Sequence, residues 1–188
     1  SPDKRSSYWE EVKKEMYGKN EELLIRIFGK DHFTKAQMVE MSFEKERGYQ
    51  KEFTPHLKLI NGLDQFFEKA HAAKIPMAIG SAAIMFNIDY ILDGLHLRNY
   101  FSTIVSADDV VTSKPDPETF LKCADGVQIP YENCIVFEDS PKGVESALRA
   151  GMKAVVIKTY HEVHEFDHLP NVLFFIDDYT DERLNTLL

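Results

Sequence analysis

The spacing of hydrophobic positions changes near residue 55. Residues 1–55 carry apolar side chains at the three- and four-residue intervals of amphipathic helices, for example Leu23, Leu24, Ile27 and Phe28 on one stripe. None of this part shows the pattern of a convincing strand. The spacing therefore predicts a small, all-helical domain over residues 1–55.

The longest helix predicted in that domain begins near Thr34. Thr34 and Gln37 have the spacing of a capping box, in which each side chain accepts a hydrogen bond from the other residue's backbone N–H. Apolar residues follow along one side of this helix: Met38, Met41, Phe43, Tyr49 and Phe53. A stripe of Met and aromatic side chains favours packing against another helix over a ligand-binding role.

From His56 onward, helical patterns alternate with short apolar runs of strand character. These runs are Ile75–Ile79, Thr103–Ser106, Ile135–Phe137, Ala154–Ile157 and Val172–Ile176. The interval from residue 135 to residue 157 holds a strand, a helix and a strand in about 23 residues, and such a unit requires a parallel sheet. The predicted fold class is α/β, with a doubly wound, Rossmann-like parallel sheet in residues 56–188.

Length and composition limit the choice of function. The 188 residues, 44% of them hydrophobic, suffice for one domain with a real core and a smaller one beside it. A formal net charge of −9 disfavours nucleic acid and anionic membranes as partners. No apolar run approaches the roughly 18 residues of a membrane span, and no signal-peptide pattern opens the chain. We expect a soluble, cytoplasmic protein, either monomeric or weakly dimeric.

Two adjacent carboxylates, Glu138 and Asp139, follow the strand run Ile135–Phe137. Ser140 is a suitable N-cap, and Pro141 suits the first position of the helix that comes next. Ligands of parallel sheets bind outside the carboxyl ends of the strands, and a Mg²⁺ ion with oxygen ligands would relieve the repulsion of adjacent acids. In the alternative interpretation, one carboxylate caps the helix and the other is solvated.

Ser81 and Lys114 are further candidates at the same edge of the sheet. Ser81 follows the run Ile75–Ile79, where a hydroxyl and free backbone N–H groups suit an anionic oxygen; the alternative is a plain N-cap serine. Lys114 precedes Pro115, which favours an extended lysine on a stiff loop before the next helix. The alternative for Lys114 is an ordinary surface lysine.

Other residues that could bind a metal or take part in a reaction have structural explanations. His161, His164 and His168 are too loosely spaced for a zinc site and predict a polar loop. The acidic run near residue 178 predicts a cap, either Asp178 or Thr180, for a short terminal helix. The two cysteines lack CxxC spacing, which favours buried free thiols over a disulfide or a zinc site.

Taken together, the motifs resemble those of one protein family. They are Ser81 after a strand, Lys114 within Ser-Lys-Pro-Asp-Pro-Glu, and Phe137-Glu-Asp-Ser140 with Gly143, Ala147 and Gly151. In this order and spacing they resemble the haloacid dehalogenase-like hydrolases, in the branch that contains β-phosphoglucomutase and small sugar-phosphate phosphatases. The resemblance covers essentially the whole chain. It implies that residues 1–55 are most of a helical cap domain and that residues 56–188 are the α/β core.

The resemblance also implies a role for each candidate residue. Ser81 and the backbone N–H of Ala82 would bind the oxygens of the transferring phosphoryl group. Lys114 would pair with the charge of the same group. Glu138 and Asp139 would hold Mg²⁺, directly or through water. This division agrees with the chemistry of phosphoryl transfer, which depends mostly on positioning and on charge stabilisation.

The activity implied by the resemblance is phosphoryl transfer on a small phosphorylated metabolite, a sugar phosphate in particular. We expect a Mg²⁺-dependent phosphatase that works through an aspartyl-phosphate. Two alternatives stay open. One is an isomerase of the β-phosphoglucomutase kind, for which Lys19 is the candidate cap contact with a second phosphate. The other is a non-catalytic binding protein that lacks the nucleophile.

The nucleophile in this family is the first aspartate of an Asp-x-Asp motif that ends a strand near the N-terminus. The 188 residues contain no such strand, so we expect it upstream of Ser1 and expect these residues alone to be inactive. In the family's sheet order that strand lies between Ile75–Ile79 and Ile135–Phe137. Direct pairing of those two runs would therefore contradict the resemblance and every role derived from it.

Overall fold

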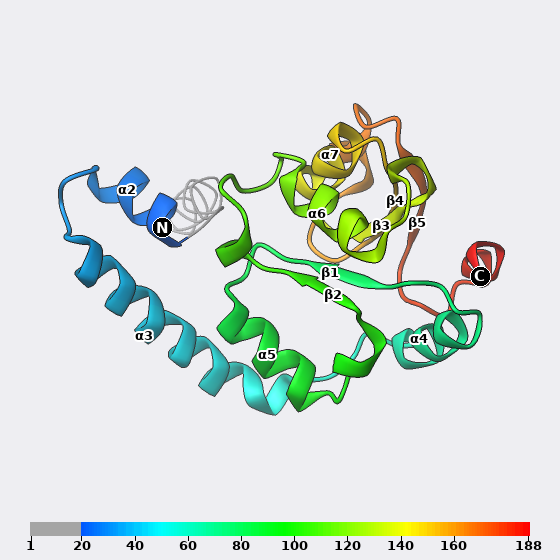
Figure 1. Ribbon diagram of the computed structural model, residues 1–188, viewed down its shortest axis with the longest axis horizontal. Coiled ribbons are helices and arrows are strands. Elements are labelled where there is room, and N and C mark those ends of the chain that lie inside the picture. The colour runs from blue at the N-terminus through cyan, green and yellow to red at the C-terminus, as the bar shows by residue number, and fades with distance from the viewer. Residues whose placement is uncertain (1–19) are drawn as a thin grey trace, which may run out of the picture. The chain divides into compact units, whose positions relative to one another are not determined.

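The computed structural model describes residues 20–188, so Lys19 lies outside the described residues. The chain divides into two compact units, one that ends at His56 and one that comprises Leu57–Leu188. Figure 1 shows helices only in the described part of the first unit, and helices with strands in the second. Within residues 20–188, none of the helices combines the length and the apolar character that crossing a lipid bilayer requires.

The first unit contains helices α2 (Asn20–Phe28) and α3 (Lys35–Phe53), followed by the 3₁₀ helix η1 (Thr54–His56). The capping box at the start of α3 is confirmed, because Gln37 N donates to Thr34 Oγ1 at 3.3 Å and Thr34 N donates to Gln37 Oε1 at 2.9 Å. These two bonds satisfy backbone donors that a helix start leaves free.

The predicted apolar side of α3 is buried unevenly. Met38 is 8% exposed, whereas Met41 is 38% exposed. Glu46 on the same helix is polar but buried, at 7% exposure. It forms an ion pair with the neighbouring Lys45 at 3.3 Å. The stripe of Met and aromatic residues is therefore a less complete packing surface than its spacing predicts.

The second unit is built on two parallel sheets. β1 (Ala78–Gly80) pairs with β2 (Thr103–Val105), and the other sheet has the order β3 (Ile135–Glu138), β4 (Lys153–Ile157) and β5 (Val172–Ile176). Every strand pair is parallel, and helices lie between successive strands (Figure 1). The predicted α/β class is thus confirmed. Parallel neighbours place their carboxyl ends at one edge, and this edge carries the candidate site.

Helices follow or precede each strand of the second unit. The α-helices are α4 (Leu63–Ala72), α5 (Met85–Gly94), α6 (Glu118–Val127) and α7 (Pro141–Arg149), and the 3₁₀ helices are η2 (Arg98–Tyr100), η3 (Ala107–Asp109), η4 (Tyr131–Asn133), η5 (Val163–Phe166) and η6 (Glu182–Leu187). Helix α6 packs against β1 and β2, and α7 packs against β3 and β4. Val144 of α7 and Ala154 of β4 pack in one buried cluster, and Val155 packs in another with Ile157 and Ile176; all three valine and alanine side chains are fully buried. Both cysteines are free thiols, as predicted, but only Cys123 is buried, and Cys134 is partly exposed.

The strands β1 and β3 each pair along one edge. In the part of the chain that the structure describes, β1 pairs only with β2, and β3 pairs only with β4. The direct pairing of β1 with β3 that would contradict the family resemblance is absent from this part. Ile135 of β3 is 37% exposed and the residues of β1 are half-buried, in contrast to the buried β4. Inner strands of a doubly wound sheet are normally buried on both faces, so these two strands have the burial of sheet edges.

The C-terminal segment differs from its prediction. The terminal helix is η6, and its N-cap is Asp181, whose Oδ1 accepts a hydrogen bond from Arg183 N at 3.0 Å. Asp178 Oδ1 instead accepts from Thr180 N at 2.8 Å, which closes a turn before the helix. The prediction of Asp178 or Thr180 as the cap is wrong, because Asp178 and Asp181 can both bond to the backbone two residues on and the spacing does not distinguish them.

Candidate active site

Lys114 joins the two sheets at their carboxyl edge. Its Nζ donates to the carbonyl oxygen of Gly80, the last residue of β1, at 3.2 Å. The same Nζ forms an ion pair with Oε1 of Glu138, the last residue of β3, at 2.5 Å. The two side chains are 13% and 11% exposed, so this is a largely buried pair. The interpretation of Lys114 as a surface lysine is therefore wrong.

The loop that carries Lys114 is held at several points. Asp116 N donates to Ser113 O at 3.1 Å, and the side chain of Asp116 accepts from Glu118 N at the start of α6 at 3.0 Å. Ser146 of α7, which is fully buried, donates its hydroxyl to the carbonyl oxygen of Asp116 at 2.8 Å. The ammonium group of Lys114 also lies over the ring of Phe120, 4.4 Å from its centroid. These contacts fix the lysine in the stiff loop that the sequence predicts.

Glu138 is bound to the start of α7 as well as to Lys114. Its Oε2 accepts from the backbone N–H groups of Asp139 and Ser140, at 3.1 and 3.3 Å, and from Ser140 Oγ at 3.1 Å. Ser140 is the N-cap, as predicted, with its Oγ accepting from Gly143 N at 3.1 Å. A Cβ atom added to Gly143 would lie 2.0 Å from Cδ of Glu138, so only glycine leaves room for this carboxylate.

Asp139 is exposed and has a different environment. Its Oδ2 accepts a hydrogen bond from Thr159 Oγ1 at 3.0 Å, and its Oδ1 has no hydrogen-bond partner among residues 20–188. Tyr179, which packs against Phe137 of β3, has a hydroxyl pKa well above its usual range because of burial and, secondarily, the charge of Asp139. The two adjacent carboxylates thus differ: both oxygens of Glu138 are bonded, while Asp139 offers one free oxygen.

The carboxylates of Glu138 and Asp139 suit a Mg²⁺ ion that keeps most of its water ligands. Among residues 20–188, no group of three or more His, Cys, Asp and Glu side chains could hold a metal ion. Mg²⁺ does not need such a cage, because it commonly keeps several waters and takes one or two carboxylates together with substrate phosphates. The free Oδ1 of Asp139 suits direct ligation, and the fully bonded Glu138 suits contact through water.

Ser81 lies at the end of β1, beside the carbonyl group that binds Lys114. Its backbone N–H donates to Val105 O at 2.9 Å, and its Oγ accepts from Ala83 N at 3.1 Å, which leaves the hydroxyl proton available for an anion. Within the described residues the backbone N–H of Ala82 has no hydrogen-bond partner. Two donors therefore lie next to each other at the end of this strand.

The alternative role of Ser81 as a helix cap is wrong. Helix α5 begins at Met85, and its N-cap is Ile84, which contributes no side-chain bond. The first turn is instead bonded by Asp108, whose Oδ2 accepts from Met85 N at 3.0 Å. Asp108 belongs to η3, which directly follows β2, so this contact depends on the pairing of β1 and β2 and has no local sequence signal.

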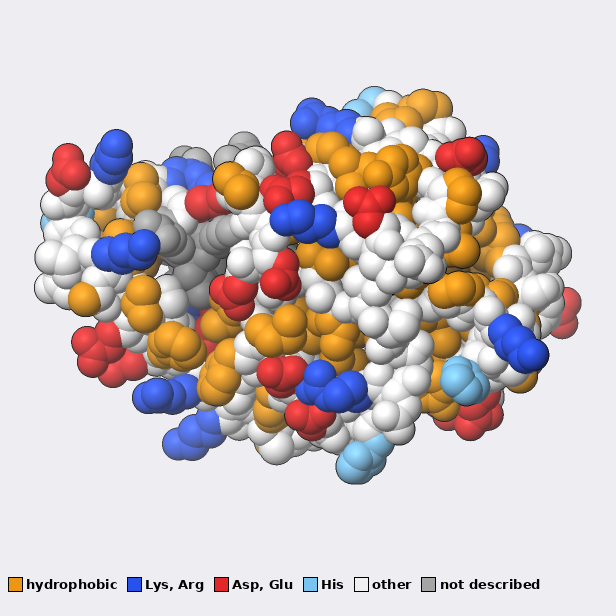
Figure 2. All heavy atoms as spheres, viewed as in Figure 1, with side chains coloured by type: hydrophobic (Ala, Val, Ile, Leu, Met, Phe, Trp, Pro, Cys, Tyr) orange, Lys and Arg blue, Asp and Glu red, His pale blue; other side chains and the backbone are white. Residues whose placement is uncertain are grey.

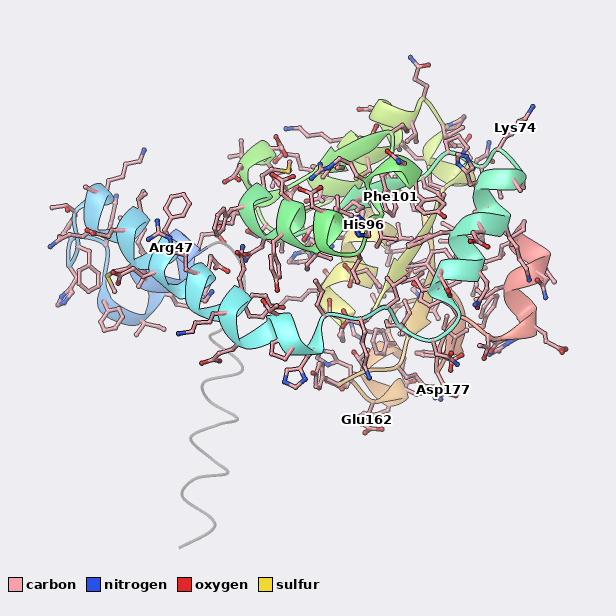
Figure 3. The ribbon with its side chains drawn as sticks, turned by 90° about the horizontal axis from the view of Figure 1, so that it is seen from below. Arg47, Lys74, His96, Phe101, Glu162 and Asp177 are labelled. Carbon is pink, nitrogen blue, oxygen red and sulfur yellow. The ribbon has the colours of Figure 1, made fainter. Side chains whose placement is uncertain are left out.

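The loops after β4 and β5 border the same edge. Figure 3 shows Glu162 and Asp177, which follow these two strands, on the same side of the second unit. Asp177 forms an ion pair with Lys158 at 2.7 Å, and His161 Nδ1 lies 3.1 Å from Glu165 Oε1. Figure 2 shows charged side chains of both signs interspersed over the face that it draws. The two ion pairs place charged side chains in the loops after β4 and β5.

The comparison with known proteins agrees with this geometry. The family model for haloacid dehalogenase-like hydrolases matches residues 2–157, and the chain belongs to this family. The chain is 39% identical over 90 residues to fructose-1-phosphate phosphatase of Escherichia coli (strain K12), an alignment that covers 48% of each protein. The chain spans about half the length of the first curated relatives that it matches, 46% and 48%.

Solved structures support the same fold. A family IA hydrolase of the superfamily from Entamoeba histolytica matches with a TM-score of 0.79 and 25% identity, over 95% of this chain and 82% of that one. β-Phosphoglucomutase from Clostridium difficile matches with a TM-score of 0.72 and 22% identity, over 89% of this chain and 74% of that one. The resemblance to this family and branch, based on motifs in the sequence, is thus confirmed.

Proposed function

We propose that the protein is a Mg²⁺-dependent phosphatase that acts on a small phosphorylated metabolite, with sugar phosphates as the favoured substrate class. The observation that carries this proposal is the contact of Lys114 with both Gly80 O and Glu138 at the carboxyl edge of the sheets. It brings a cation next to the free donors of Ser81 and Ala82. The similarity to a fructose-1-phosphate phosphatase supports the substrate class.

The residues divide the work of binding a phosphoryl group. Ser81 Oγ and Ala82 N–H would donate to its oxygens, and Lys114 would pair with its charge. Asp139 would ligate Mg²⁺ through Oδ1, and Glu138 would contact it through water. When bound, the ion supplies charge stabilisation and orientation of the phosphoryl oxygens. Preorganised charges of this kind act most strongly where the phosphoryl group becomes more charged during transfer.

The nucleophile would be an aspartate that comes from outside the described residues. The free edges of β1 and β3 are where a further parallel strand could pair, and a strand there would end beside Ser81, Lys114 and Glu138. Its carboxylate oxygen would form a bond to phosphorus while the bond from phosphorus to the substrate oxygen breaks. Water would then hydrolyse the aspartyl-phosphate, which releases inorganic phosphate and restores the carboxylate.

The test measures phosphate release by the full-length protein from p-nitrophenyl phosphate and from a panel of sugar phosphates. We expect release that depends on Mg²⁺, stops with EDTA and is fastest with a sugar phosphate. Conversion of one sugar phosphate into an isomer without net phosphate release would favour the β-phosphoglucomutase-type isomerase instead. Binding of phosphorylated sugars without turnover of either kind would favour the non-catalytic binding protein.

A further inference from the structure

Thr159 contacts a candidate metal ligand from a neighbouring loop. Its Oγ1 donates to Oδ2 of Asp139 at 3.0 Å, although the two residues are 20 positions apart in the sequence. No motif in the sequence draws attention to Thr159, and the roles already assigned at the carboxyl edge do not include it. The contact follows from the sheet, because Glu138 and Val156 are register partners in the parallel strands β3 and β4.

The residue before Thr159 is held by contacts with β5 and the loop that follows it. Lys158 N donates to Ile176 O at 2.9 Å, which continues the pairing of β4 with β5 up to the residue before Thr159. The side chain of Lys158 also pairs with Asp177 at 2.7 Å. Thr159 is exposed, but its backbone starts from a fixed point, and its hydroxyl therefore reaches Asp139 from a defined direction.

We propose that Thr159 is a positioning residue that presents Asp139 to the divalent cation. Its hydroxyl occupies Oδ2 and leaves Oδ1 as the oxygen for the ion. This inference rests on the proposed function, since it assumes that Asp139 is a Mg²⁺ ligand. An exposed aspartate without such a partner rotates freely about its terminal torsion, and a cation that binds it must then stop this rotation.

The expected size of the effect follows from comparable sites. Partners that hydrogen-bond to metal-ligating side chains typically change metal affinity by about tenfold to 100-fold when they are removed. Thr159→Val removes the hydroxyl while it keeps the shape and the β-branching of the side chain. Thr159→Ser keeps the hydroxyl. The pair of variants therefore separates the hydrogen bond from the packing of the loop.

The chain offers a matched control for the loss of a threonine hydroxyl. Thr180 Oγ1 donates to Oδ1 of Asp178 at 2.6 Å in the loop after β5, which is the same kind of bond between the same two residue types. Asp178 also accepts from Asn61 Nδ2 at 3.1 Å and has no assigned contact with the ion. Thr180→Val therefore reports what such a bond contributes to the fold alone.

The experiment titrates Mg²⁺ into the full-length protein by isothermal titration calorimetry, with Asp139→Asn as the reference for a lost ligand. We expect Thr159→Val to weaken Mg²⁺ binding by about tenfold or more, while Thr159→Ser and Thr180→Val bind like the unmodified protein. Turnover of Thr159→Val at saturating Mg²⁺ should return to that of the unmodified protein.

Two other results have distinct meanings. If Asp139→Asn weakens Mg²⁺ binding but Thr159→Val does not, the role of Thr159 is refuted and the proposed function stands. If the unmodified protein binds no Mg²⁺, or if Asp139→Asn binds it equally well, the metal role of Asp139 fails and the inference fails with it. Equal weakening by Thr180→Val would show a general effect of loop stability and would also overturn the inference.

Discussion

Replacement of Lys114 by alanine is the sharpest test of the site. The change removes a cation whose Nζ lies 2.5 Å from Glu138 Oε1 and 3.2 Å from Gly80 O. At that first distance, and with an effective dielectric constant of about 20, the gross attraction is roughly 7 kcal/mol. Much of this offsets the cost of desolvating both groups, but removal of one partner of a buried pair typically destabilises a protein by about 3–5 kcal/mol, because the other charge is left buried.

Lys114→Ala should also affect turnover. The loss of one preorganised donor to a developing negative charge costs about 2.7–4 kcal/mol in comparable enzymes. Because about 1.4 kcal/mol of activation free energy corresponds to a factor of ten, Lys114→Ala should lower kcat by at least about two orders of magnitude. KM should change less, if the charge acts mainly in the transition state.

The assay compares kcat, KM and the thermal unfolding midpoint of Lys114→Ala with those of Lys122→Ala. Lys122 is a lysine of α6 that pairs with Glu118 at 2.7 Å, and its side chain is 46% exposed. Ion pairs four residues apart on a helix contribute only about 0.3–0.5 kcal/mol, and Lys122 does not contact the candidate site, so its loss should leave kcat unchanged. A decrease in kcat of about tenfold or less in well-folded Lys114→Ala would refute the catalytic role.

Three further predictions concern the groups around this lysine. Asp139→Asn should raise the Mg²⁺ concentration that gives half-maximal activity with little change in the circular dichroism spectrum; an unchanged Mg²⁺ dependence would remove Asp139 from the metal site. Gly143→Ala should lower the free energy of unfolding in urea by about 1–3 kcal/mol, because its Cβ would overlap the carboxylate of Glu138; full stability would show that the carboxylate moves freely. Ser146→Ala should cost about 1–3 kcal/mol in the same measurement, since it leaves the carbonyl oxygen of Asp116 without its buried donor; a neutral effect would contradict that contact.

Features that depend on neighbouring residues in the chain could be predicted from the sequence. The capping box of Thr34 and Gln37 and the N-cap at Ser140 involve partners three residues apart, so spacing alone identifies them. The strand runs around residues 104, 136, 156 and 174 also appear in the structure, because buried parallel strands have a distinct composition. Strand limits were less accurate, as β1 begins at Ala78 and not at Ile75.

Contacts between distant segments could not be predicted in the same way. Ser146 and Asp116 are 30 residues apart, and Lys114 and Glu138 are 24 residues apart. Their approach depends on how α6 and α7 pack against the two sheets, which no local pattern specifies. The family resemblance supplied the role proposed for Lys114, but it did not predict the contact of Lys114 with Gly80 O or the hydrogen bond from Ser146 that holds its loop.

The arrangement around Glu138 explains why activity and stability should separate in Lys114→Ala. Glu138 Oε2 keeps its donors from Asp139 and Ser140 when the lysine is removed, because these bonds belong to the start of α7. The carboxylate would therefore stay in position and remain partly compensated by the N-terminus of the helix. The same bonds would hold Glu138 in place when Lys114 pairs with a phosphoryl oxygen. In the proposed site, Lys114 could therefore pair with a substrate phosphate while Glu138 keeps its hydrogen bonds to the start of α7.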